Sequence, residues 1–135
     1  MKMKNYVIFA IDNDNDLHTV SKFLRHVDTQ RALGNIKGTL KPCIGSYKGQ
    51  MENSYIMRLD DFDLVVAGSG YVDNQESILL VEEGHRGVLY GTLLFSSISM
   101  KDQPLGILRA VPPEKAITHD GWTYRPDLDT YYVVV

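Results

Sequence analysis

The sequence predicts a single α+β domain over residues 1–135, a ferredoxin-like β-α-β-β-α-β sandwich with extra C-terminal strands. The chain has 135 residues, a length that suits one domain with one hydrophobic core. Its apolar residues follow strand and helix periods in the order strand, helix, strand, strand, helix, strand. In the ferredoxin-like arrangement two helices cover one face of an antiparallel sheet. The other face stays open, so we expect another subunit to cover it.

The first strand and the first helix lie before residue 35. Residues 6–11 form an apolar run, and residues 16–33 carry apolar side chains at helical spacing. The intervening residues include Asp12, Asp14 and Asp16, which favour a helix N-terminus as caps and through the helix dipole. They do not complete a calcium-binding loop, because the required Gly and the closing Glu are missing. Gly34 ends the predicted helix.

Residues 41–57 read as a hairpin around which the sheet is organised, with Lys48-Gly49 as its turn. A two-residue loop pairs Tyr47 with Gln50, Gly45 with Glu52, Cys43 with Ser54 and Lys41 with Ile56. Because side chains alternate across a strand, these residues share one face. The opposite face is apolar and is expected to pack on the core; it carries Leu40, Ile44, Tyr55 and Met57.

The remaining elements are assigned from similar patterns. A second helix begins at Asp60-Asp61. Gly68-Ser69-Gly70 lies inside this helix or at its end, and this glycine pair lacks the G-x-G-x-x-G spacing of a nucleotide-binding loop. Further elements are strands over 78–81, 88–95 and 106–111, a helical turn from Glu114 to Ala116, and a last hairpin of 121–126 and 131–135.

Composition and charge exclude several classes of function. The net charge of -3 argues against nucleic-acid binding, which requires a basic patch. No apolar run is long enough to cross a bilayer, so we expect no membrane association and a cytoplasmic location. Cys43 is the only cysteine, which excludes an internal disulfide and a cysteine-based zinc site. The histidines form no H-x-x-x-H pair, so no metal is expected.

The candidate site is the polar face of the hairpin, with Ser46, Tyr47, Glu52 and Ser54, joined by Glu76 at the start of a later strand. Glu is depleted in strands, and a Glu opposite Gly45 leaves room for a ligand beside the carboxylate. A partly desolvated carboxylate needs a partner, which a cationic ligand supplies.

Five segments together resemble phage-encoded S-adenosylmethionine-degrading enzymes: residues 45–54, 75–79, 88–90, 111–112 and 122–124. The resemblance implies a homotrimer similar to PII proteins, with sites between subunits. It implies a lyase that needs no metal or cofactor and takes S-adenosylmethionine as its substrate. The products are 5'-methylthioadenosine and homoserine lactone. It also implies an anti-restriction role in the cytoplasm of an infected bacterium.

The resemblance also implies roles for the hairpin residues. Glu52 holds the α-ammonium of the substrate, and Tyr47 contacts its sulfonium or its carboxylate. Backbone groups near Gly45 and Ser46 bind the adenosine, while Ser54 and Glu76 complete the substrate site. Two readings from other classes stay open: a non-catalytic PII-like trimer that binds nucleotides, and a phage protein that inhibits a host enzyme by binding it.

Overall fold

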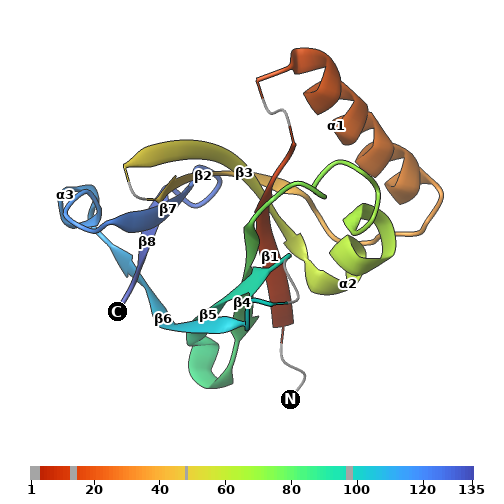
Figure 1. Ribbon diagram of the computed structural model, residues 1–135. Coiled ribbons are helices and arrows are strands. Elements are labelled where there is room, and N and C mark those ends of the chain that lie inside the picture. The colour runs from red at the N-terminus through yellow and green to blue at the C-terminus, as the bar shows by residue number, and fades with distance from the viewer. Residues whose placement is uncertain (1–3, 13–14, 48, 97–98) are drawn as a thin grey trace.

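The computed structural model describes residues 4–12, 15–47, 49–96 and 99–135, with Tyr47 described in its backbone only. In this part of the chain eight antiparallel strands form a closed barrel, and the helices lie outside it (Figure 1). The order around the barrel is β1-β3-β2-β7-β8-β6-β5-β4, with β4 returning to β1. The strands are β1 (Lys4–Ala10), β2 (Lys41–Tyr47), β3 (Gln50–Arg58), β4 (Ser77–Glu83), β5 (Leu89–Phe95), β6 (Gln103–Val111), β7 (Gly121–Arg125) and β8 (Thr130–Val134).

The predicted ferredoxin-like sandwich is therefore wrong. The N-terminal half does follow the order β-α-β-β-α-β, and its strands lie in the order β4-β1-β3-β2. However, β5 pairs with β4, β7 pairs with β2, and β6 and β8 join the two sides. Closure satisfies the backbone groups that the edges of an open sheet leave unpaired. It also removes the open sheet face on which the expectation of a covering subunit was based.

The predicted hairpin register is confirmed residue by residue. Gly45 pairs with Glu52, Cys43 with Ser54, and Lys41 with Ile56. The face that carries these residues points into the barrel, where Gly45, Glu52 and Ser54 line a cavity. The opposite face of β3 packs outward, since Met57 is buried in the core under the helices and Tyr55 lies against it.

The first helix, α1 (Leu17–Ala32), confirms the prediction over 16–33. Asp16 is its N-cap: the carboxylate accepts hydrogen bonds from the Thr19 hydroxyl at 2.9 Å and the His18 backbone N–H at 3.0 Å. These bonds, with that to Thr19 the stronger influence, lower the pKa of Asp16. At the other end Gly34 has φ of 79°, and its N–H bonds to the Arg31 carbonyl, as in a Schellman motif. Asp14 lies outside the described residues.

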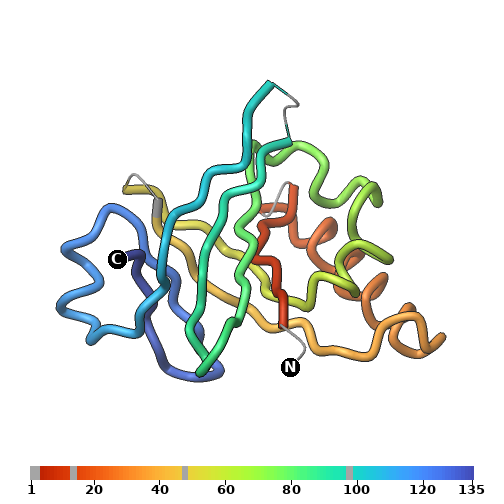
Figure 2. The backbone as a smooth tube through the Cα atoms, turned by 90° about the horizontal axis from the view of Figure 1, so that it is seen from below, coloured from red at the N-terminus to blue at the C-terminus, as the bar shows by residue number. Residues whose placement is uncertain are grey.

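The main hydrophobic core lies between the barrel wall and the helices. Val7 and Phe9 point outward from β1 to meet Phe23 and Val27 of α1. The Phe9 and Phe23 rings meet edge to face, with centroids 6.0 Å apart. Figure 2 shows α1 on one side of the barrel and the C-terminal strands on the other. Helix packing thus covers β1 and β3 and leaves the interior of the barrel for another use.

The second predicted helix is short and changes from an α-helix to a π-helix along its length. A single turn, α2 (Leu59–Asp61), continues as a π-helix over Phe62–Val66. The predicted helix end at Gly68 is confirmed, because Gly68 follows this segment with φ of 73°. The predicted turn after the two prolines is α3 (Pro113–Ala116), and a 3-10 turn, His85–Gly87, joins β4 to β5.

Candidate functional site

A cavity of about 520 Å³ occupies one end of the barrel. Its walls are largely apolar and include Ile8, Leu79, Leu93, Leu105 and Leu108. Its polar lining includes Ser46, Glu52, Ser54, Gln75, His119 and Asp120. We call this space the upper cavity. An apolar pocket with a few polar groups is the usual form of a small-molecule site.

Four of the six predicted site residues line the upper cavity: Gly45, Ser46, Glu52 and Ser54. Glu76 is not among its lining residues; it is exposed just before β4, where its backbone carbonyl accepts a bond from the Ser96 N–H at 3.1 Å. The backbone of Tyr47 pairs with Gln50 and Gly121 at the end of β2, and its side chain lies outside the described part. The structure therefore brings the hairpin group together without Glu76.

Gly45 leaves open space beside Glu52. A Cβ atom built at Gly45 would lie 3.8 Å from the Ser54 hydroxyl oxygen and 3.9 Å from the Glu52 carbonyl oxygen. These are ordinary contact distances, so the local fold does not require glycine here. The glycine leaves empty the volume that a side chain opposite Glu52 would fill on the cavity side of this strand pair.

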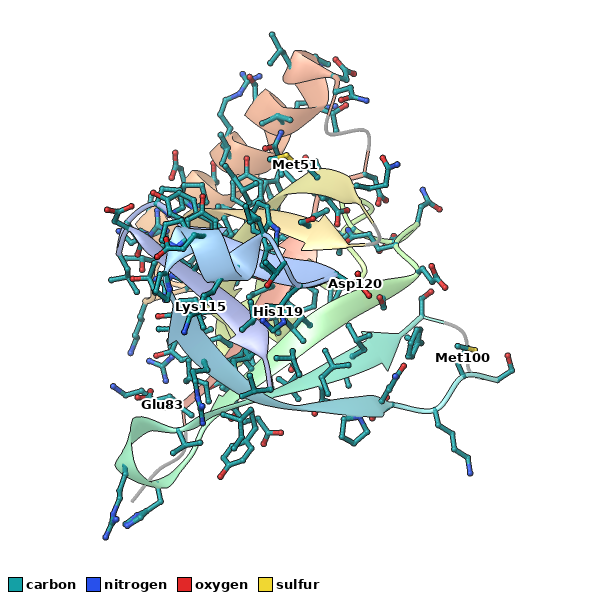
Figure 3. All side chains as sticks on the ribbon, turned by 90° about the vertical axis from the view of Figure 1, so that its left-hand side faces the viewer. Met51, Glu83, Met100, Lys115, His119 and Asp120 are labelled. Atoms are coloured by element: carbon teal, nitrogen blue, oxygen red, sulfur yellow. The ribbon has the colours of Figure 1, made fainter. Side chains whose placement is uncertain are left out.

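Residues after α3 form another part of the cavity wall and were not predicted as site residues. His119 and Asp120 are exposed in the segment that leads into β7, and Trp122 and Thr123 follow in the strand. Figure 3 shows Asp120 toward one end of the barrel and Glu83 toward the other. Two carboxylates, Glu52 and Asp120, thus lie at the upper cavity, which favours a cationic ligand.

The opposite end of the barrel contains a lower cavity of about 430 Å³. The two cavities share Ile8, Leu108, Thr123 and Tyr132 as lining residues, so they adjoin one another in the middle of the barrel. The charged groups lining the lower cavity are Lys4, Glu83 and Arg125. Arg125 is bound to Asp127 by two hydrogen bonds, at 3.2 and 2.7 Å. With Asp127 included, positive and negative groups are equal in number, so the lower cavity favours neither a cationic nor an anionic ligand.

Cys43 lies on the inward face of β2 and is buried. Burial raises the pKa of its thiol from 9.0 to about 11. The neutral thiol therefore predominates at neutral pH, whereas nucleophilic catalysis requires the thiolate. This supports the interpretation of Cys43 as a small strand residue. Among the described residues no group of three or more His, Cys, Asp or Glu side chains is placed to hold a metal ion.

Residues 11–135 match the model of the S-Adenosylmethionine lyase family. The chain belongs to this family. The match confirms the resemblance to S-adenosylmethionine-degrading enzymes, without their phage origin, and the predicted function, an enzyme that acts as an S-adenosylmethionine lyase. It includes β2 to β8 and begins just after β1, which supplies Ile8 and Ala10 to the upper cavity. No curated protein matches the sequence. Within the described ranges, no helix is long and apolar enough to cross a membrane.

Proposed function

We propose that this lyase cleaves S-adenosylmethionine in the upper cavity, with Glu52 as the group that orients the substrate. The observation that carries this assignment is the position of Glu52, opposite Gly45 and beside open space in a cavity of about 520 Å³. The substrate carries an ammonium and a sulfonium against one carboxylate, so it is a net cation. A cavity with Glu52 and Asp120 in its lining is electrostatically suited to it.

The proposed reaction is an intramolecular displacement. An oxygen of the substrate carboxylate forms a bond to the γ-carbon, and the bond between that carbon and sulfur breaks. The electron pair stays on sulfur, which becomes the neutral thioether of 5'-methylthioadenosine. The other product, homoserine lactone, keeps the ammonium group. No proton moves and no external nucleophile enters, so the enzyme needs only to hold the methionine part in a reactive conformation.

The cavity wall supports this reaction in a second way. The reacting carboxylate and sulfonium have opposite charges, and both charges disappear as the new bond forms. In water each charge is stabilised by hydration, which opposes the reaction. Apolar side chains such as Leu79, Leu93 and Leu108 replace that water. A carboxylate against the sulfonium itself would stabilise the charged ground state, so we place Glu52 on the ammonium.

Other groups of the cavity have supporting roles in the proposal. Backbone groups of Gly45 and Ser46, at the end of β2, are available to the adenosine. Ser54 is only 6% exposed and lies two residues from Glu52 on the same face of β3. We place its hydroxyl beside the amino-acid part of the substrate. Contact of Tyr47 with the sulfonium or the carboxylate, and a role for Glu76, stay predictions from the resemblance.

The test follows both products over time in water enriched in ¹⁸O. The proposal predicts methylthioadenosine and homoserine lactone in equal amounts, with no ¹⁸O in the lactone at early times. Homoserine with ¹⁸O in its hydroxyl group would show attack by water at the γ-carbon and would contradict the intramolecular step, whereas later hydrolysis of the lactone places ¹⁸O only in the carboxylate.

We further propose that the enzyme is a homotrimer that acts in the cytoplasm of an infected bacterium as an anti-restriction protein. Resemblance alone supports this proposal, because the closed barrel removes the open sheet face that also suggested it. Light scattering at micromolar concentration is the measurement. A mass of one chain, 15.3 kDa, would contradict the trimer.

A further inference from the structure

The side chain of Gln75 takes the place of a strand residue at the mouth of the upper cavity. Strands β1 and β4 pair from Lys4↔Glu83 to Ile8↔Leu79. Continued by two residues, this register would place Ser77 opposite Ala10. Instead, the Ala10 N–H donates to Oε1 of Gln75 at 2.8 Å, and Nε2 of Gln75 donates to the Ala10 carbonyl. One carboxamide therefore makes both hydrogen bonds that a neighbouring peptide group would make.

The segment around Gln75 is fixed to the end of β1 at two further points. The Asp12 N–H donates to the Tyr71 carbonyl at 2.7 Å. The carboxylate of Asp12 accepts a bond from the Asn74 N–H at 3.0 Å. Residues 71–75 are thus held along the end of β1, and Gln75 is the member of this segment that lines the upper cavity. The cavity wall between β1 and β4 is made by a side chain at this point.

Ala10 connects this contact to the proposed site. On its other side Ala10 pairs with Ser54 of β3, two residues from Glu52. We infer that Gln75 is a positioning residue of the lyase: its two bonds to Ala10 fix the end of β1, and through Ser54 they hold Glu52 in place. The inference rests on the proposed role of Glu52 in substrate binding. Gln75 itself is given no contact with the reacting atoms.

Three variants test this role. Gln75→Met keeps the length of the side chain but can neither donate nor accept these bonds. Gln75→Glu accepts from the Ala10 N–H when ionised, but only its protonated form can also donate to the Ala10 carbonyl. Asn74→Ala is the control, because Asn74 contacts Asp12 through its backbone N–H, which alanine keeps.

Turnover measurements distinguish an effect of Gln75 on substrate positioning from an effect on protein stability. For Gln75→Met we expect kcat/KM about ten- to a hundredfold below wild type, with most of the loss in kcat, because an orienting group that shifts by about 1 Å costs this much. Assays run well below the melting temperature of each variant keep the folded fraction constant. A kcat within twofold of wild type would overturn the inference, as would an equal loss in Asn74→Ala.

The pH dependence of activity in Gln75→Glu distinguishes a positioning role from a purely structural one, which would leave that dependence unchanged. Its activity, divided by that of wild type at the same pH, is expected to rise as pH falls from 8 to 5, because protonation restores the donor. The same ratio for Gln75→Met is expected to stay constant. A constant ratio for Gln75→Glu would contradict the need for both bonds.

Amide hydrogen exchange tests the contact without reference to activity. The Ala10 N–H is expected to exchange at least tenfold faster in Gln75→Met than in wild type or Asn74→Ala. An unchanged rate would show that the contact does not protect Ala10 and would overturn the inference. If wild type forms no methylthioadenosine, the proposed function fails, and exchange at Ala10 alone then decides whether the contact exists.

Discussion

Substitution of Gly45 is expected to change the activity of the proposed site without weakening the fold. A Cβ atom there meets nothing nearer than 3.8 Å, and Gly45 is not among the residues with positive φ. A Cβ atom therefore fits without strain, and because Gly45 lines the upper cavity we expect the γ-methyl groups of valine to extend into that cavity. Glycine within a strand costs about 0.5–1 kcal/mol relative to a residue with a side chain. We expect Gly45→Val to be as stable as wild type or up to about 1 kcal/mol more stable.

The same substitution should remove activity, because the side chain of valine enters the space next to Glu52. If the substrate ammonium is displaced from the carboxylate, the lost charge-assisted hydrogen bond is worth roughly 1.5–3 kcal/mol. That corresponds to about a ten- to hundredfold fall in kcat/KM, since each 1.4 kcal/mol is about tenfold. The assay measures methylthioadenosine by chromatography and stability by urea denaturation.

A second glycine inside the barrel provides the control. A Cβ atom at Gly91 would lie 3.5 Å from side-chain carbons of both Leu108 and Leu79, and Gly91 does not line either cavity. Gly91→Ala is expected to keep the wild-type KM, whereas Gly45→Ala raises it and Gly45→Val raises it further. Wild-type kinetics in Gly45→Val would show that no ligand occupies the space beside Glu52 and would refute the reasoning.

Two further predictions concern stability. Gly38→Ala should lower the free energy of unfolding by about 1–3 kcal/mol in urea denaturation. The added Cβ would lie 2.6 Å from Oδ2 of the buried Asp61, an atom that accepts a hydrogen bond from the Gly38 N–H at 3.1 Å. A denaturation midpoint equal to that of Gly45→Ala would contradict this prediction. The raised pKa of Cys43 favours the folded state below pH 9, and this contribution is lost as pH rises toward about 11. Solvent screening limits the loss to at most roughly 2 kcal/mol, and the same pH slope in Cys43→Ala would exclude the thiol as its cause.

Most elements were predictable because their signals are local. Asp16 and Gly34 mark the two ends of α1 through hydrogen bonds within a few residues of each other. The hairpin register followed from a two-residue turn and the alternation of side chains, which is why the pairing of Gly45 with Glu52 was correct. These signals need no knowledge of the distant parts of the chain.

Closure of the barrel was not predictable from the same signals. It depends on pairs such as Ile44 with Tyr124, which lie 80 residues apart, and no local pattern specifies that register. The N-terminal half has the element order of an open sandwich, so the C-terminal strands were treated as additions to its edge. In the structure they pair with both edges of that half through β4 and β2.

The candidate site was predictable only where the hairpin contributes to it. His119 and Asp120 reach the upper cavity because β7 lies beside β2, which requires the closed topology. At the start of β4 the sequence favoured Glu76 as a polar residue at the mouth of a buried strand, whereas the neighbouring Gln75 lines the cavity. An uncharged side chain with two backbone partners gives no compositional signal, since its role depends on Ala10, 65 residues away.

The most direct test of the central claim is methylthioadenosine formation by Glu52→Gln, with Glu114→Gln as the matched control on the exposed turn α3. Loss of the charge at Glu52 should lower kcat/KM about ten- to a hundredfold, because a hydrogen bond to a charged group is worth roughly 1.5–3 kcal/mol. Glu114→Gln should match wild type, and both variants should keep the wild-type melting temperature within a few degrees. Equal turnover by Glu52→Gln and wild type would contradict the account, and a loss in Glu76→Gln instead would place the essential carboxylate there.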